Sequence, residues 1–231
     1  IDGSPPVGLC GTGLIDCLSE MFLTGMVDRS GRFQVQRAPK RFRASKEDGR
    51  PEFLLVSTEE SGSQSDVVIS QADVENLIRT KGSIYAAADS LVRSVGVSFG
   101  DVQKVYIAGA FGNRLNTTSA VTIGLLPDLP GEQIRFIGNS SVAGAKRVML
   151  SRRMLEEVYA IRNRISYQEL MVDPAYMDKF TSACFLPHTD LARFPMVSER
   201  LDARARRREK LQIGTQKKET THGHPEEENH G

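Results

Sequence analysis

The sequence of 231 residues has no Cys-x-x-Cys pair and only three cysteines, Cys10, Cys17 and Cys184. An odd number without paired spacing argues against a disulfide framework and is typical of a reducing compartment, so we expect a cytoplasmic protein. The missing pair also leaves this chain without an evident zinc or iron–sulfur site of its own.

The sequence also lacks an excess of charge of either sign and lacks a long hydrophobic run. Its 30 basic and 29 acidic residues give a net charge of +1, which provides no overall attraction to nucleic acid or to an anionic membrane. No apolar run approaches the roughly 18 residues that span a bilayer, and the first residues have no signal-peptide pattern. We therefore expect no membrane or nucleic-acid partner. Because the chain does not begin with Met, we expect a fragment or a processed product.

Apolar residues become scarce at the C-terminal end, from about residue 198. The domain organisation that follows is a folded part over residues 1–197 and a charged, disordered tail over residues 198–231, helical in part near 199–211. The tail begins with an arginine cluster and ends rich in Lys, Glu and His. Without an aromatic platform beside it, a charged tail with no dedicated ligand is favoured over a nucleic-acid contact.

Helical spacing of apolar residues and capping signals predict several helices. One follows the glycines near residue 11 and ends at Gly25. A longer helix begins at Ser70, which with Asp73 resembles a capping box, and it ends at Gly96. Further helices are expected from about residue 140 and over 154–165. Asp173 followed by proline is typical of another helix start.

Short apolar runs predict strands over 53–56, 67–69, 105–108, 134–137 and 167–172. The charged segment 37–50 is expected to be an exposed loop or the rim of a hairpin. Strands alternating with helices indicate an α/β fold with a mixed sheet flanked by helices. In such folds ligands usually lie at the carboxyl ends of the strands.

Two glycine-rich turns are the candidate binding elements. The first is Gly8-Leu9-Cys10-Gly11-Thr12-Gly13, directly before a helix, where backbone N–H groups can face an anion. Asp16 would lie in the first helical turn; a helix-dipole role is favoured, and positioning of Mg²⁺ through water is the alternative. Cys10 is expected to be a packed small residue, because no histidine lies near it in sequence to activate a nucleophile.

The second turn is Gly109-Ala110-Phe111-Gly112-Asn113, at the end of the strand expected from residue 105. Glycines there admit a flat ligand against the backbone, although a tight turn without a ligand has the same pattern. The next strand also ends in a glycine turn, followed by Asn139 and Gly144. We predict that 105–113 and 134–145 are adjacent strand–turn–helix units lining one cleft.

These motifs follow one another in a specific order: Gly8-Leu-Cys-Gly-Thr-Gly-Leu-Ile-Asp16, Asp28-Arg-Ser-Gly-Arg-Phe33, Ile69-Ser-Gln-x-Asp73, Ala108-Gly-Ala-Phe-Gly-Asn113, Ile123-Gly-Leu-Leu-Pro127, Gly138-Asn139 and Gly144-Ala145. The ordered set resembles the C-terminal ATPase domain of the reductive activators of corrinoid (cobalamin) proteins, within the acetate and sugar kinase, heat-shock chaperone and actin superfamily. The resemblance covers about residues 7–190.

The resemblance implies an actin-like, ribonuclease H-like ATPase domain that binds ATP with Mg²⁺. Such activators use ATP to drive an electron onto the Co(II) form of a corrinoid protein in a methyltransferase system, and the electron enters through an iron–sulfur domain upstream. The second turn would face the adenosine and the first would lie near the phosphates, with Thr12 in place of a serine. The implied binding residues are Gly8, Gly11, Thr12, Gly13, Asp16, Gly109, Ala110, Phe111, Gly112, Asn113, Asn139 and Gly144.

Departures from the family pattern limit what this chain is expected to do. Only seven residues precede Gly8, so the family's Asp-x-Gly-Thr-Asn-Gly phosphate loop is absent, as are its iron–sulfur cysteines. Lys81-Gly82 and Ser140-Ser141 also differ from the usual residues. We expect the distal half of the ATPase domain, supplying the adenosine side of the cleft and a docking surface for the corrinoid protein. No catalytic residue is identified.

Two other functions remain open at this stage. One is a non-hydrolysing nucleotide-sensing or scaffold domain that docks a redox partner. The other is a small-molecule kinase of the same superfamily, which is disfavoured because no catalytic aspartate with a substrate pocket can be assigned. The sequence also leaves a homodimer open.

Overall fold

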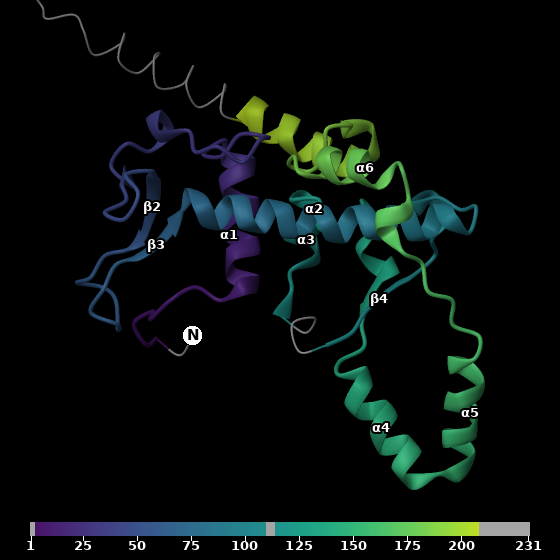
Figure 1. Cartoon of the computed structure of the whole chain (residues 1–231). Coiled ribbons are helices and arrows are strands. Elements are labelled where there is room, and N and C mark those ends of the chain that lie inside the picture. Colours follow the sequence, from purple (N-terminus) through teal and green to yellow (C-terminus); the bar gives the residue numbers. More distant parts are fainter. Residues whose placement is uncertain (1–2, 110–113, 208–231) are drawn as a thin grey trace, which may run out of the picture.

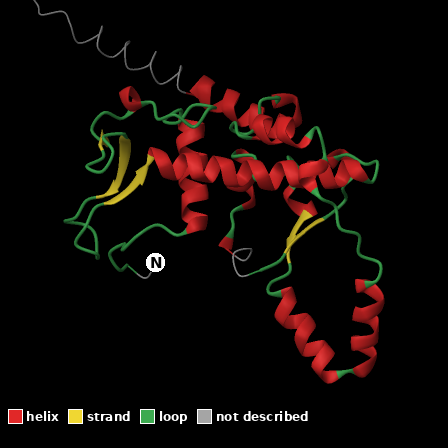
Figure 2. Cartoon of the chain, viewed as in Figure 1, coloured by secondary structure: helices red, strands yellow, loops and turns green. Residues whose placement is uncertain are grey.

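The structure is a computed structural model that describes residues 3–109 and 114–207. A long helix, α2, crosses the molecule, with α1 lying across it (Figure 1). A three-stranded sheet lies at one end, and a two-stranded sheet lies toward the other (Figure 2). The labelled elements are α1 Gly11–Thr24, β1 Phe42–Ala44, β2 Pro51–Val56, β3 Val67–Ser70, α2 Gln71–Ser94, β4 Val105–Ile107, α3 Thr117–Thr122, β5 Ile134–Phe136, α4 Ser140–Leu150, α5 Arg152–Arg162 and α6 Tyr176–Ala183.

The three-stranded sheet is antiparallel in the order β1-β2-β3. Phe53 pairs with Phe42 of β1 on one side and with Ile69 of β3 on the other. The rings of Phe42 and Phe53 pack edge to face with centroids 5.0 Å apart. Strand β1 lies within the segment expected to be a loop or hairpin rim, so the structure selects the hairpin.

The second sheet consists of β4 and β5, which are parallel and in register from Val105 opposite Ile134 to Ile107 opposite Phe136. Helix α3 lies in the connection between the two strands. The chain therefore has the expected α/β class, with two small sheets flanked by helices in place of a single mixed sheet.

Local capping signals set the ends of the two longest helices. Ser70 caps α2 in a full capping box with Asp73, as the sequence predicts. Gly25 adopts the left-handed conformation at the end of α1, also as predicted. Helix α2 ends at Ser94, and Gly96 follows with a φ of +78°.

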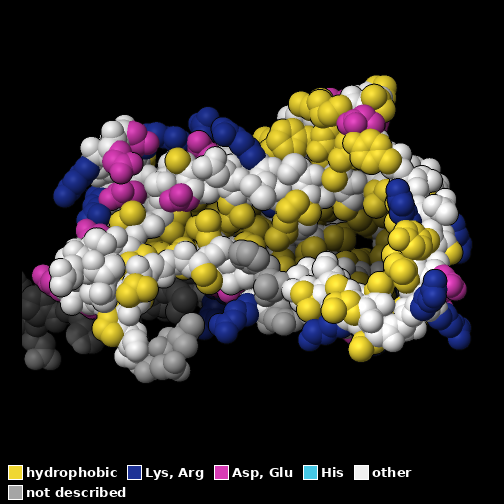
Figure 3. Space-filling model, turned by 60° about the horizontal axis from the view of Figure 1, so that its bottom comes forward, with side chains coloured by type: hydrophobic (Ala, Val, Ile, Leu, Met, Phe, Trp, Pro, Cys, Tyr) yellow, Lys and Arg dark blue, Asp and Glu magenta, His cyan; other side chains and the backbone are white. Residues whose placement is uncertain are grey.

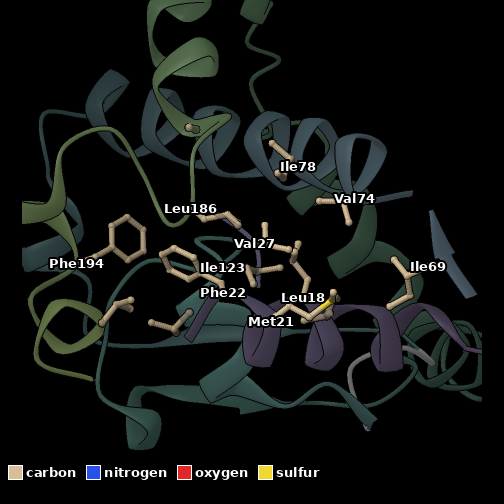
Figure 4. Close-up of a cluster of buried hydrophobic side chains, with 14 of the residues drawn as sticks. Leu18, Met21, Phe22, Val27, Ile69, Val74, Ile78, Ile123, Leu186 and Phe194 are labelled. Carbon is tan, nitrogen blue, oxygen red and sulfur yellow. The ribbon is translucent and has the colours of Figure 1, made fainter. Parts of the chain in front are cut away.

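The core gathers apolar side chains from α1, α2, α3 and the segment after α6 (Figure 4). Leu18 and Phe22 of α1 face Val74 and Ile78 of α2 across Val27 (Figure 4). Ile84 and Leu91 in α2, and Val95 at its C-cap, are also at helical spacing but are exposed.

Gly82, in the interior of α2, has a packing reason. A Cβ at this position would lie 3.0 Å from the Cys184 sulfur and 3.3 Å from the Ala183 carbonyl oxygen. A glycine costs about 1 kcal/mol in a helix interior. Here that cost permits the close approach of the C-terminal end of α6.

Two predictions around residue 170 are wrong. The strand expected over 167–172 is irregular, with a 3₁₀ turn at Leu170–Val172, and Tyr167 is 84% exposed, so this segment neither pairs with a sheet nor packs in the core. Asp173 does not cap α6, whose N-cap is Ala175. The carboxylate of Asp173 instead accepts from the Ala175 N–H and from Lys179, both at 2.9 Å.

Residues 195–207 are helical and lie against the body of the molecule. Val197 is fully buried, and Leu201 packs against the core. Arg204 forms an ion pair with Glu20 of α1 at 3.1 Å. The packed part of the chain therefore extends past residue 197, and residues 208–231 of the expected tail lie outside the described residues. Among the described residues, no helix is long and apolar enough to cross a membrane.

Candidate nucleotide-binding site

The carboxyl ends of β4 and β5 lie side by side and form one edge of the candidate site. The Gly109 N–H donates to the Gly138 carbonyl at 2.8 Å, and the Ile137 N–H donates to the Ile107 carbonyl at 3.0 Å. Gly109 and Gly138 have φ angles of +109° and +67°. The predicted adjacency of the two strand–turn units is confirmed; Ala110, Phe111, Gly112 and Asn113 lie outside the described residues.

Within the described residues, no atom fills the space beside either strand end. A Cβ added at Gly109 or at Gly138 would meet nothing within 4 Å. The glycines are therefore required by their positive φ and not by packing within the described chain. An open, Cβ-free backbone is the surface against which a flat ring can lie.

Helix α4 starts directly at this edge. Asn139 is its N-cap, and its side-chain oxygen accepts from the Val142 N–H at 3.1 Å. Gly144 is exposed, and a Cβ there would also meet nothing within 4 Å. Asn139, with Gly144 beyond it, thus lies beside the paired strand ends, and the small residue in α4 has no packing role among the described residues.

The first glycine turn lines a different cleft, of about 360 Å³. Gly8 and Gly11 line it together with β3 and with the carboxylate-bearing Asp66 and Asp73. The described lining includes no residue of the second glycine turn. Gly109, the one residue of the second turn that the structure describes, does not line this cleft.

Negative charge marks the cleft beside the first turn. Bonds from the Thr58 hydroxyl and from Arg43, 2.7 and 2.6 Å long, hold the pKa of Asp66 at about 2. This carboxylate stays ionised at neutral pH, so the cleft does not attract phosphate through the described residues alone. Thr12, also assigned to the phosphate side, is buried, and the Gly13 N–H donates to the Cys10 sulfur at 3.4 Å.

Cys10 was expected to be packed, and the structure corrects this: Cys10 is exposed and is the N-cap of α1. Bonds from the Thr12 hydroxyl and from the Gly13 N–H lower the pKa of its thiol. The capping role explains its position at the end of the glycine turn, because the sulfur accepts from the first helical turn.

Asp16 lies within α1, one turn after the glycines. Its Oδ1 atom is buried and has no hydrogen-bond partner among the described residues. A buried acceptor without a donor is uncommon in folded proteins. A helix-dipole interaction does not satisfy this oxygen, whereas a donor or a metal-bound water does.

The structure contains a buried ionic cluster around Asp89 that the sequence analysis did not predict. Asp89 is 2% exposed and bonds Arg93 at 3.0 Å and Arg193 at 2.5 Å. Burial and the charge of Arg193 lower the pKa of His188 to about 4, so this histidine is neutral. Only the Asp89–Arg93 pair, four residues apart on one helix, has a signal in sequence. The cluster ties α2 to the segment after α6.

Comparison with known proteins identifies relatives that match most of this chain. A family model described as the C-terminal domain of RACo, the ASKHA domain, matches residues 1–198. The corrinoid activation enzyme RamQ of Eubacterium limosum is 30% identical over 186 residues, covering 78% of this chain. A [Co(II) methylated amine-specific corrinoid protein] reductase of Methanosarcina barkeri is 29% identical over 170 residues, covering 74% of this chain.

A solved structure has the same fold. It is titled a reductive activator for corrinoid, iron–sulfur protein, and it superposes with a TM-score of 0.78 at 42% identity over 84% of this chain. The chain spans 31% of the length of that structure. It spans 31% of the Eubacterium relative and 27% of the Methanosarcina relative.

Proposed function

The chain belongs to the family of C-terminal ASKHA domains of RACo, and from this membership we propose that it supplies the adenosine side of an ATP cleft. The observation that carries the proposal is the hydrogen bond between Gly109 and Gly138, which joins two glycine strand ends beside the start of α4. The ATP would serve the reductive activation of a corrinoid protein, the process for which its relatives are named.

The geometry suits an adenosine at this edge. The open backbone at Gly109 and Gly138 leaves room for the flat base, because no side chain of the described chain occupies that space. Gly144 keeps the adjacent turn of α4 free of a side chain. The amide nitrogen of Asn139 can donate to a ring nitrogen or to a ribose oxygen while its oxygen caps α4.

The first glycine turn would lie toward the phosphates. Asp16 fits Mg²⁺ in its donor chemistry, since its Oδ1 is an orphaned carboxylate oxygen. Mg²⁺ usually keeps several waters and bridges to protein carboxylates through them. When bound, the ion would neutralise the phosphate oxygens beside the negative cleft of Asp66 and Asp73. Asp16 would then help to hold the ion through a metal-bound water.

The remaining parts of the activity would come from sequence outside this chain. A phosphate loop and an iron–sulfur domain would complete the ATP cleft and the electron path. Within the longer protein, ATP would drive an electron onto the Co(II) corrinoid of a separate protein. The chain alone is then expected to bind adenine nucleotide weakly and to hydrolyse ATP poorly, because most phosphoryl-transfer catalysis is positioning of the phosphates and their metal.

Replacing Gly109 with tryptophan should lower the affinity of the chain for ADP at least tenfold, since the indole would fill the space of the adenosine. Titration calorimetry with ADP measures this, and tenfold corresponds to about 1.4 kcal/mol of binding free energy. The matched control is Gly96→Trp, which has a similar left-handed backbone, with φ of +78°, and equally open surroundings. Equal ADP binding by both variants would contradict the site.

Replacing Gly144 with alanine should raise the free energy of unfolding by about 1 kcal/mol, because it removes a glycine from an exposed helix. The same methyl group should weaken ADP binding by several-fold through contact with the bound ring. Val142→Ala is the control: it also improves helix propensity, and residue 142 lies about 200° around the helix from residue 144. A Gly144→Ala chain that gains stability and keeps full ADP affinity would remove α4 from the site.

A further inference from the structure

Helices α4 and α5 form a hairpin that extends away from the rest of the molecule (Figure 1). Neither helix contains a buried residue. Their apolar side chains are instead presented to solvent, with Met149 85% and Leu150 88% exposed at the tip. The other exposed apolar residues of the hairpin and the segment after it are Val142, Leu155, Val158, Tyr159, Ile161, Ile165 and Tyr167.

The exposed apolar side chains of the α4–α5 hairpin indicate a surface that binds another molecule. Contiguous exposed apolar patches on proteins usually mark interaction sites, whereas single exposed apolar residues need no explanation. Figure 3 shows hydrophobic side chains spread over the face that turns forward, with Lys and Arg at its edges. The hairpin is the part of the described chain in which two whole helices lack a buried side.

The charge of the hairpin indicates the chemistry of that occupant. Residues 140–165 hold six basic side chains and two acidic ones, although the whole chain is nearly neutral. Glu157, one of the two acidic residues, is already paired with Arg153 at 3.1 Å. The remaining basic residues are Lys146, Arg147, Arg152, Arg162 and Arg164. A second copy of this hairpin would bring like charges together, so self-association is disfavoured.

The residue types favour a protein partner over a permanent internal contact. Five of the six basic residues are arginines, and the apolar set includes methionine and tyrosine. Arg, Met and Tyr are enriched in protein–protein interfaces, whereas Lys is depleted there. The interior of a single protein has few charges, so a face with this many arginines does not resemble a surface that stays covered.

We propose that the α4–α5 hairpin docks a protein whose contact face combines apolar side chains with carboxylates. This inference rests on the proposed function, in which the chain acts on a separate corrinoid protein, and it assigns the docking surface to one element. The hairpin begins at Asn139, next to the candidate adenosine edge, so the docked partner would contact the same helix that borders the nucleotide.

Lysine 146 makes the docking testable by a zero-length cross-link, because Lys146 is the only lysine in residues 140–165. A carbodiimide joins an amine directly to a carboxylate. The native protein that carries this chain, mixed with the corrinoid protein of its organism, should give a cross-link from Lys146 to an Asp or Glu of the partner. Lys146→Arg keeps the charge but removes the amine, so it should remove that cross-link. Cross-links only from other lysines would overturn the proposal.

The apolar part is tested by Met149→Ser with Leu150→Ser. Because both side chains are already exposed, the change should leave the fold intact while raising the dissociation constant for the corrinoid protein at least tenfold. Val95→Ser is the matched control, since Val95 is 71% exposed at the end of α2. Binding of the double variant equal to that of the control would overturn the proposal. ADP affinity should be unchanged in all three proteins, so a failure of docking is separable from a failure of the nucleotide site.

Other occupants give different results in the same set of proteins. If maleimide cannot label the new thiol of Met149→Cys in the native protein without its partner, the rest of the polypeptide covers the tip. A dimer in light scattering that the double variant dissolves would assign the surface to a second copy. Binding to phosphatidylglycerol vesicles in place of the corrinoid protein would assign it to an anionic membrane. Each of these results would overturn the proposal.

Discussion

Replacing Gly124 with alanine should lower the free energy of unfolding by about 3 kcal/mol or more, because strain and collision add. Gly124 follows α3 with a φ of +76°, and an added Cβ would lie 2.1 Å from the carbonyl oxygen of Pro187. The colliding atom belongs to the backbone, which cannot rotate away as a side chain can. Thermal unfolding should show a melting temperature roughly 6–12 °C lower for a domain of this size.

Gly96→Ala separates the two causes. Gly96 has nearly the same backbone, with φ of +78°, but nothing lies within 4 Å of its Cβ position. In this control the free energy of unfolding should fall by only about 1–2 kcal/mol, which is the cost of a left-handed conformation for a residue with a Cβ. If both variants lose the same stability, the contact between Gly124 and Pro187 has no energetic weight.

The contact also connects to the candidate site. Helix α3 lies between the second glycine turn and Gly124, so a shift of the α3 end away from Pro187 moves the chain that leads back to Gly109. We therefore expect Gly124→Ala to weaken ADP binding as well as the fold. The glycine was visible in sequence within the motif Ile123-Gly124-Leu125-Leu126-Pro127, but its reason is a contact with a residue 63 positions away.

Local signals were sufficient for the starts of α2 and α4 and for the paired glycine strand ends. Ser70 caps α2 and Asn139 caps α4 through bonds to residues three positions on, so their sequence neighbours decide the structure. The glycines at 109 and 138 interrupt apolar runs, which is readable without tertiary information. The adjacency of their strands then follows from the usual geometry of parallel pairs.

Signals that depend on tertiary partners were misread or not seen. The apolar residues at 167–172 resemble a strand, but no sheet edge among the described residues pairs with them. Cys10 resembles a small packed residue, yet it caps α1 at an exposed position. Asp89 and Arg193 are 104 residues apart, and no local sequence pattern predicts their ion pair. The exposed hairpin face was likewise hidden, because its apolar spacing is that of any helix with a buried side.

Lys81 is a buried lysine of α2, and its ionisation should make the stability of the fold depend on pH. Its side chain is fully buried, and its ammonium donates to the carbonyl oxygens of Phe185 and Pro187. Burial lowers the pKa of Lys81 to about 7, and proximity to the Cys184 sulfur acts in the opposite direction. A neutral amine can still donate to both carbonyls, so loss of the proton preserves the contacts.

The sign of the pH dependence follows from the two states. Above about pH 7 the folded chain has released the Lys81 proton, while the unfolded chain holds it up to the ordinary pKa of 10.5. The unfolded state then binds more protons, so stability rises with pH across this window. The slope of the free energy of unfolding is at most about 1.4 kcal/mol per pH unit for one proton. Below pH 7 both states are protonated, and burial of the charge opposes folding.

Lys81→Met should remove this dependence. Methionine fills most of the same space without a charge, so the stability of wild type relative to this variant should rise steadily from pH 7 to pH 10. Lys81→Ala should also remove the pH dependence, and it should lower the free energy of unfolding by about 3–5 kcal/mol at neutral pH. The loss arises because the substitution leaves a cavity and two unpaired carbonyls. The control is Lys104→Met at an exposed lysine, and the measurement is urea unfolding at a series of pH values. Parallel pH curves for wild type and Lys81→Met would show that Lys81 keeps its proton in the folded chain, held by the carbonyls of Phe185 and Pro187.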